Sequence, residues 1–203
     1  TFVTAPGMPI DVLRSWAPFT DIFCLGGPES FDKAPILIRQ GRKAWYYDGA
    51  ASKAHHPVGV ARREFWRAFR VGLEGLGVWA YACSGWQQTG EETAWTERDN
   101  IGRGDASMIY RGKHGPVTSK RWEAWRDGVE DYWLLTLLDK AHREDKTTVN
   151  PRSLAAKATA LPKKKGSGTD PLDMAFHADE DSRDAKRILA AREKLMDAIA
   201  ELE

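Results

Sequence analysis

Two aromatic segments on either side of one amphipathic helix constrain this chain more than any other feature. Residues 43–48 (K-A-W-Y-Y-D) and 75–81 (G-L-G-V-W-A-Y) both have the composition of strands. Residues 57–73 repeat apolar side chains at every third or fourth position, which predicts a helix with one buried face. A strand–helix–strand unit of this kind predicts parallel strands joined by a right-handed crossover.

The same alternation extends toward the N-terminus. Residues 21–25 (D-I-F-C-L) form a short apolar run that predicts a buried parallel strand, and residues 1–4 predict another. Helices are expected over residues 10–16 and over residues 31–40, the second ending at Gly41. Four strand–helix units are half of an eight-unit barrel, so the predicted fold class is α/β, the C-terminal half of a (β/α)8 TIM-type barrel. A half sheet exposes unpaired edges, so we expect it to depend on a missing N-terminal half of the same polypeptide.

The rest of the chain predicts a long loop and a C-terminal helical extension. Residues 82–115 are polar and glycine-rich, with a strand-like segment at 107–110, and a helix is expected from Ser119 to about residue 142. The expected domains are 1–145 (half-barrel), 146–181 (loop or linker) and 182–203 (C-terminal helix). The residues expected to form the buried stripe of the 119–142 helix are Trp122, Trp125, Val129, Trp133 and Leu137.

Composition excludes several classes of function. The chain has 30 basic and 29 acidic residues, a formal net charge of +1, which argues against a nucleic-acid partner. No apolar stretch is long enough to span a membrane, and no Cys/His spacing predicts a metal or another cofactor. Cys24 and Cys83 fit either a disulfide or two buried thiols; the thiols are favoured, and the compartment stays open.

Polar aromatic residues at the expected strand ends are the candidate binding residues. Barrel enzymes place their chemistry at the carboxyl ends of the strands, and flat rings there suit a sugar ring. The candidate substrate-binding residues are Tyr47, Asp48, Trp79 and Tyr81 at strand ends and Trp86, Trp95 and Tyr110 in the following loop. Each of them could instead be a packing residue of the barrel or of the loop. Asp127, Glu130 and Asp131 are assigned to structural ion pairs.

Residues 44–138 resemble the catalytic domain of glycoside hydrolase family 123 and its relatives. The resemblance rests on the W-Y-Y strand (45–47), the R-R-E-F-W helix segment (62–66), residues 72–81, the Gly104-Asp105 turn leading to Tyr110, and S-K-R-W-E-A-W-R-D-G-V-E-D-Y (119–132). The resemblance implies a barrel that hydrolyses β-N-acetylgalactosaminide-type glycosides with retention. In that family the substrate's own 2-acetamido group attacks the anomeric carbon, supported by an adjacent Asp–Glu pair.

This chain departs from the family at the catalytic pair. Its only Asp-Glu dipeptide, Asp179-Glu180, precedes the last helix and is expected to be N-terminal helix charge. We therefore expect no catalytic residue in this chain, with the pair on an earlier strand outside it. Two alternatives stay open: a non-catalytic carbohydrate-binding or scaffold relative, and an α/β interaction domain whose Trp residues are all core. The resemblance favours a secreted or cell-surface location.

Overall fold

The computed structural model describes residues 1–27, 29–49, 56–79, 108–160 and 178–202. The chain forms two compact units, residues 1–50 with 67–118 and residues 51–66 with 119–203, and each is described by itself. None of the described helices is both long enough and apolar enough to cross a membrane.

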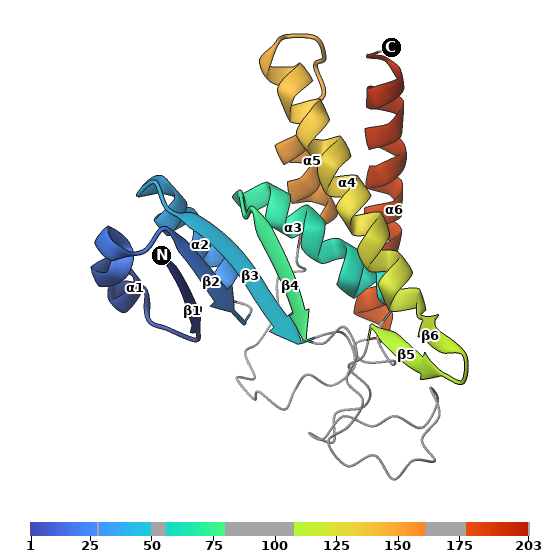
Figure 1. Ribbon diagram of the computed structural model, residues 1–203. Helices are drawn as coiled ribbons and strands as arrows, with labels where there is room; N and C mark the ends of the chain where they lie inside the picture. The colour runs from blue at the N-terminus through green and yellow to red at the C-terminus, as the bar shows by residue number, and fades with distance from the viewer. Residues whose placement is uncertain (28, 50–55, 80–107, 161–177, 203) are drawn as a thin grey trace. The chain divides into compact units, whose positions relative to one another are not determined.

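The first unit contains a four-stranded parallel sheet (Figure 1). Its strands are β1 (Phe2–Pro6), β2 (Ile22–Gly26), β3 (Lys43–Gly49) and β4 (Gly75–Trp79), and they pair in chain order. All three pairings are parallel, so the predicted strands and their direction are confirmed. A doubly wound sheet reverses its strand order at a switch point, whereas a barrel adds each strand beside the previous one. The four described strands show no reversal of order.

Helices in the crossovers cover one face of this sheet. They are α1 (Ile10–Trp16), continued by the 3₁₀ turn η1 (Ala17–Phe19), and α2 (Ser30–Arg39). The sequence predicts that the helix over residues 31–40 stops at Gly41; α2 ends at Arg39, and Gly41 follows its C-cap Gln40 with φ 76°. Positive φ is costly for residues with a side chain, so glycine ends the helix cleanly.

The two faces of the sheet differ in burial. On the helix-covered face, Phe23, Leu25 and Ala44 are almost completely buried, and Tyr46 packs on Phe31 of α2 with ring centroids 4.6 Å apart. Residues of the opposite parity lie on the other face, where Trp45 keeps 38% of its surface exposed. Parallel sheets are normally covered on both faces. Within this unit, the described residues leave one face of the sheet open.

A short antiparallel hairpin follows in the same unit. Strand β5 (Ile109–Gly112) pairs with β6 (Gly115–Thr118) and overlaps the strand-like segment expected at 107–110, of which residue 107 lies outside the described residues. Gly115 turns the chain with φ 136°, a conformation that favours glycine.

The second unit is helical. It contains the π-helical turn η2 (Val58–Arg62) with the start of α3 (Arg63–Val71), and then α4 (Lys120–Arg143), α5 (Pro151–Ala158) and α6 (Ala178–Ala200). Ser119 caps α4 by accepting a hydrogen bond from the backbone N–H of Trp122. Helix α5 lies within residues 146–181, which were expected to be a loop; Asn150 caps it and Pro151 begins it.

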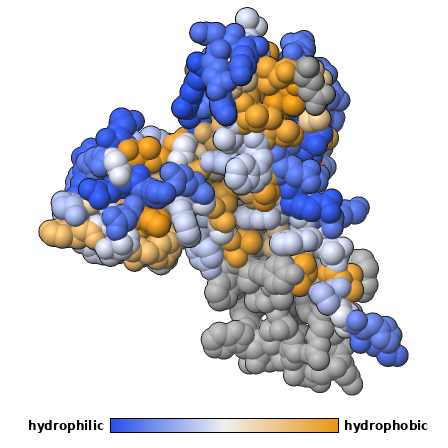
Figure 2. Space-filling model, turned by 45° about the horizontal axis from the view of Figure 1, so that its top comes forward, coloured by the Kyte–Doolittle hydropathy of each residue, from blue (hydrophilic) through white to orange (hydrophobic). Residues whose placement is uncertain are grey.

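Helix α4 buries a different face from the one predicted. The expected stripe is wrong for three of its members, because Val129, Trp133 and Leu137 are exposed by 38%, 67% and 49%. The buried face consists of Arg121, Ala124, Gly128, Asp131, Leu135, Leu138 and Ala141. This face combines small residues, which allow close helix contact, with two charged residues that rarely point inward. In Figure 2, exposed hydrophobic residues (orange) are visible among the hydrophilic ones (blue).

Candidate functional site

The open face of the sheet carries two aromatic residues of β3, Trp45 near the middle of the strand and Tyr47 nearer its carboxyl end. Trp45 and Tyr47 alternate with the buried residues of β3 and therefore lie on this face. The register pairs Trp45 with Cys24 and Gly75, and Tyr47 with Gly26 and Gly77. The neighbours of each ring on β4 are thus glycines.

Because the two facing residues of β4 are glycines, there is room for both rings. A methyl group on Gly75 would lie 2.6 Å from Cγ of Trp45, and one on Gly77 would lie 3.0 Å from Cδ2 of Tyr47. The two rings therefore lie against the backbone of β4. Phe2 of β1 contacts Trp45 edge-on, with ring centroids 5.5 Å apart, so the aromatic surface continues toward the first strand.

Burial keeps two titratable side chains of this face, Tyr47 and Cys24, neutral, whereas Lys43 at the start of β3 forms an ion pair with Glu74. Burial raises the pKa of the Tyr47 hydroxyl, and the neighbouring Cys24 raises it further. Burial also raises the pKa of the Cys24 thiol, so this cysteine is not an activated thiolate. The face offers flat apolar surface and an uncharged phenol that both donates and accepts hydrogen bonds. That combination suits an uncharged ligand with one apolar face.

The predicted binding residues are placed unequally. Tyr47 is half-buried on β3, and the register puts Trp79, the partner of Gly49, at a position of the same face. Asp48 pairs with Val78 and takes the opposite parity, together with Tyr46. The side chains of Asp48, Trp79 and Tyr110 lie outside what the structure describes, as do the whole of Tyr81, Trp86 and Trp95. The binding role stays a prediction for these six residues and for Tyr47 alike.

The sequence contained a signal for the ring–glycine arrangement. Trp45-x-Tyr47 on one strand and Gly75-x-Gly77 on the next have the same two-residue spacing. Residues two apart lie on the same face of a strand. Only the register shows that the two pairs stand opposite each other.

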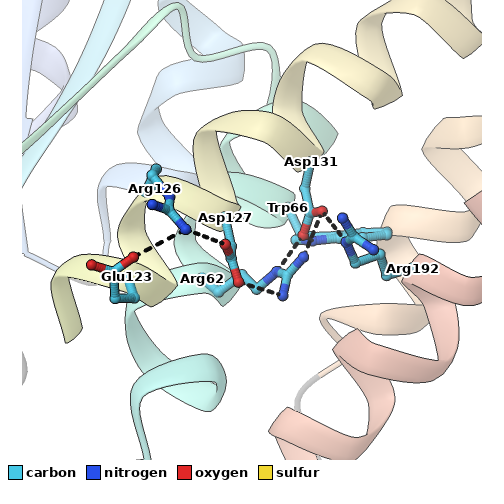
Figure 3. A network of polar contacts seen from close by, with 7 residues as sticks. All are labelled: Arg62, Trp66, Glu123, Arg126, Asp127, Asp131 and Arg192. Atoms are coloured by element: carbon cyan, nitrogen blue, oxygen red, sulfur yellow. Dashed lines mark hydrogen bonds and ion pairs between the residues drawn. The ribbon is translucent and has the colours of Figure 1, made fainter. Parts of the chain in front are cut away.

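A second concentration of polar residues lies in the helical unit (Figure 3). Asp131, fully buried on α4, accepts hydrogen bonds from Nε and Nη2 of Arg62 at 2.6 and 2.8 Å. It also accepts from Nε1 of Trp66 at 2.8 Å and from Nε of Arg192 at 3.1 Å. We call Arg62, Trp66, Asp131 and Arg192 the Asp131 cluster.

Arg62 extends this cluster toward the start of α4. Its Nη1 donates to Asp127 at 3.2 Å, and Arg126 bridges Asp127 and Glu123. Burial alone would lower the pKa of Arg62, but its bonds and charge interactions with Asp131, and then the charge of Asp127, raise it above the ordinary value.

The predicted ion-pair roles of Asp127 and Asp131 are confirmed. Arg62 is only 4% exposed, and its burial is compensated by these carboxylate partners. Four donated bonds occupy the oxygens of Asp131, so this carboxylate is a structural anion and not a general acid. Among the residues that the structure describes, no three His, Cys, Asp or Glu side chains gather as a metal site.

Comparison with known proteins finds a family model that matches part of the chain. Residues 42–138 match the family model of the glycoside hydrolase 123 catalytic domain, so the resemblance is confirmed for that stretch. A solved structure is also similar: a family 123 glycoside hydrolase from Clostridium perfringens, analysed for glycolipid glycan hydrolysis. The TM-score is 0.55 at 14% identity, over 97% of this chain and 42% of that one. The present chain therefore spans about two fifths of that protein's length. No curated protein matches it.

Proposed function

We propose, from the match of residues 42–138 to glycoside hydrolase family 123, that this chain is the C-terminal half of a (β/α)8 glycosidase barrel. Its aromatic sheet face would form one wall of the sugar site. One observation carries the proposal: an in-order parallel sheet whose open face holds Trp45 and Tyr47 against glycines. In a barrel, that face points inward and its carboxyl end lines the ligand site.

The proposed substrates are β-N-acetylgalactosaminide-type glycosides. The wall suits them because a pyranose has apolar C–H faces that stack on rings and hydroxyls that bond to a phenol or a carboxylate. The proposed reaction is retaining hydrolysis in which the substrate's 2-acetamido oxygen attacks the anomeric carbon. A Glu protonates the leaving oxygen and later activates water, while an adjacent Asp orients the acetamido group.

We place that Asp–Glu pair outside this chain. The buried carboxylate of Asp131 is bound on both oxygens, and Asp179-Glu180 belongs to the first turn of α6. The chain's own contribution is then to bind and orient the sugar, which lowers the barrier by holding the reacting atoms in place. A secreted or cell-surface location is part of the same proposal.

The test compares the full-length protein with this chain alone on an aryl β-N-acetylgalactosaminide. We expect turnover by the full-length protein and none by residues 1–203. Tyr47→Ala in the full-length protein should raise KM more than it lowers kcat, since it removes binding surface. Turnover by the isolated chain would refute the placement of the pair. Sugar binding without turnover by the full-length protein would favour the non-catalytic relative.

A further inference from the structure

We infer that Gly77 is a positioning residue for Tyr47: it keeps free the space across the strands in which the Tyr47 ring lies, and so fixes where the phenol meets a sugar. The inference deepens the proposed function and rests on it. Gly77 lies on β4, the strand that pairs with the strand of Tyr47.

The first step is the position of Tyr47 between two glycines. Its register partners are Gly26 on β2 and Gly77 on β4, and Gly26 pairs in turn with Pro6 on β1. At this level of the four described strands, Tyr47 is thus the one long side chain on the open face. In small barrels such a level is usually filled by several side chains.

The second step is the reason for glycine at each position. Gly7, Gly27 and Gly41 have positive φ and open space where a Cβ would point, so they serve backbone conformation. Gly77 has no such φ, and a Cβ there would meet the Tyr47 ring at 3.0 Å. Glycine at 77 therefore leaves space for the Tyr47 ring where it lies, the usual role of a strand glycine beside a close neighbour.

The third step is the direction in which the ring can lie. Over Gly26 the space is taken by Pro6, whose Cβ would be 2.8 Å from an added methyl group. Gly77 has no side chain to fill the space above it, and the Tyr47 ring occupies that space. Closing that space would move the ring outward by a few tenths of an ångström for alanine and further for β-branched valine.

The consequence concerns binding geometry more than folding. Misplacing a binding group by about 1 Å costs on the order of a hundredfold in rate. A displacement of a few tenths of that distance should weaken sugar binding by about threefold to tenfold for Gly77→Ala, and more for Gly77→Val.

Gly75 provides a matched control on the same strand. Its added methyl group would be even closer to a ring, 2.6 Å from Trp45, so Gly75→Ala should disturb the sheet at least as much. It does not face Tyr47, because its partner is Trp45. A role for Gly77 that is merely structural would make the two variants alike.

The experiment measures two quantities in the full-length protein: the affinity for N-acetylgalactosamine by calorimetry and the pKa of Tyr47 by NMR of ¹³C-labelled tyrosine, assigned with Tyr47→Phe. We expect both Gly77→Ala and Gly77→Val to weaken binding, the valine variant more strongly. Both should also lower the Tyr47 pKa toward its ordinary value, because the ring moves toward solvent. Gly75→Ala should leave the Tyr47 pKa unchanged. Equal effects of Gly75→Ala and Gly77→Ala on that pKa would overturn the inference, as would no effect of Gly77→Val.

A double variant separates this inference from the proposed function. In a Tyr47→Ala background, Gly77→Ala should lose most of its effect on thermal stability, because the ring that it meets is gone. An unchanged effect in that background would overturn the positioning role. If the wild-type protein binds no N-acetylgalactosamine, the proposed function fails, while the pKa and the double variant still decide the relation between Gly77 and Tyr47.

Discussion

The two units are stabilised in different ways. In the sheet unit, stability comes from apolar side chains on the helix-covered face, such as Phe23 and Leu25, which are almost completely buried. A buried core residue typically contacts several others. In the helical unit, a buried carboxylate joins residues that are 61 to 69 positions away in the sequence. Apolar contacts are many and weakly directional, whereas Asp131 depends on a few specific donors. The sheet unit should therefore tolerate a change that the Asp131 cluster does not.

The largest expected effect is the loss of Arg62. Arg62→Met leaves the buried Asp131 charge without its bidentate partner, and breaking such a pair costs about 3–5 kcal/mol. Urea unfolding should show that loss in the free energy of unfolding. Arg126→Met is the control, since Arg126 is 61% exposed and should contribute about 0.5 kcal/mol or less. Similar values for the two variants would show that the cluster is not a special feature of the helical unit.

The next effect tests the sheet unit. Leu25→Ala removes a side chain that is 1% exposed, and substitutions of this kind cost about 2–5 kcal/mol. We expect a value near the lower end, about 2–3 kcal/mol, because the contacts of Leu25 are shared among several neighbours. A loss larger than that of Arg62→Met would reverse the comparison between the two units.

A smaller effect is expected at the closest helix contact. Gly128 of α4 lies against Phe65, and an added methyl group would be 2.3 Å from the ring. Alanine gains up to about 1 kcal/mol of helix propensity, but overpacking costs about 1–3 kcal/mol, so a net loss of about 1–2 kcal/mol is expected. Phe65→Leu should relieve that loss in a double-mutant cycle, and additive losses would argue against the contact.

The two faces of α4 provide the next test. Leu135 is fully buried and Leu137 is 49% exposed on the same helix. Leu135→Ala should cost about 2–5 kcal/mol, whereas Leu137→Ala should stay within about 0.5 kcal/mol. Thermal unfolding of this chain measures both. A large loss at Leu137 would mean that the predicted apolar stripe is buried after all.

The strands were predictable and the buried face of α4 was not, for a physical reason. Short apolar runs such as residues 22–25 report burial directly, and the helices between them imply parallel pairing. Helix α4 has apolar residues on two sides, and its buried side includes Arg121 and Asp131. Burial of Asp131 is made favourable by distant partners, Arg62, Trp66 and Arg192, and sequence periodicity cannot locate them.

The candidate site divides in the same way. Position at a strand end was enough to select Tyr47, because parallel strands gather their carboxyl ends at one edge. The roles of Gly26 and Gly77 depend on register, which a one-residue shift would change entirely. The position of Tyr47 near a strand end could thus be predicted from the sequence, whereas its neighbours on the adjacent strands could not.

The smallest expected effect is the pH dependence that Tyr47 gives the sheet unit. The pKa of Tyr47 is raised in the folded state above its ordinary value near 10. Below that ordinary value the hydroxyl is protonated in both the folded and the unfolded states, and its contribution to stability is complete. As the pH rises further, the unfolded state loses the proton first, so the free energy of unfolding falls until the folded-state pKa is passed.

The measurement is urea unfolding of the wild type and of Tyr47→Phe between about pH 9 and about pH 11, with the other tyrosines and the lysines common to both proteins. The wild type should lose more stability over this range than the variant, because phenylalanine has no proton to release. Equal slopes would mean that the Tyr47 hydroxyl is solvated like that of a free tyrosine. The ring would then lie away from β4, and the open face of the sheet would lack the ordered aromatic surface on which the comparison with the charged helical unit depends.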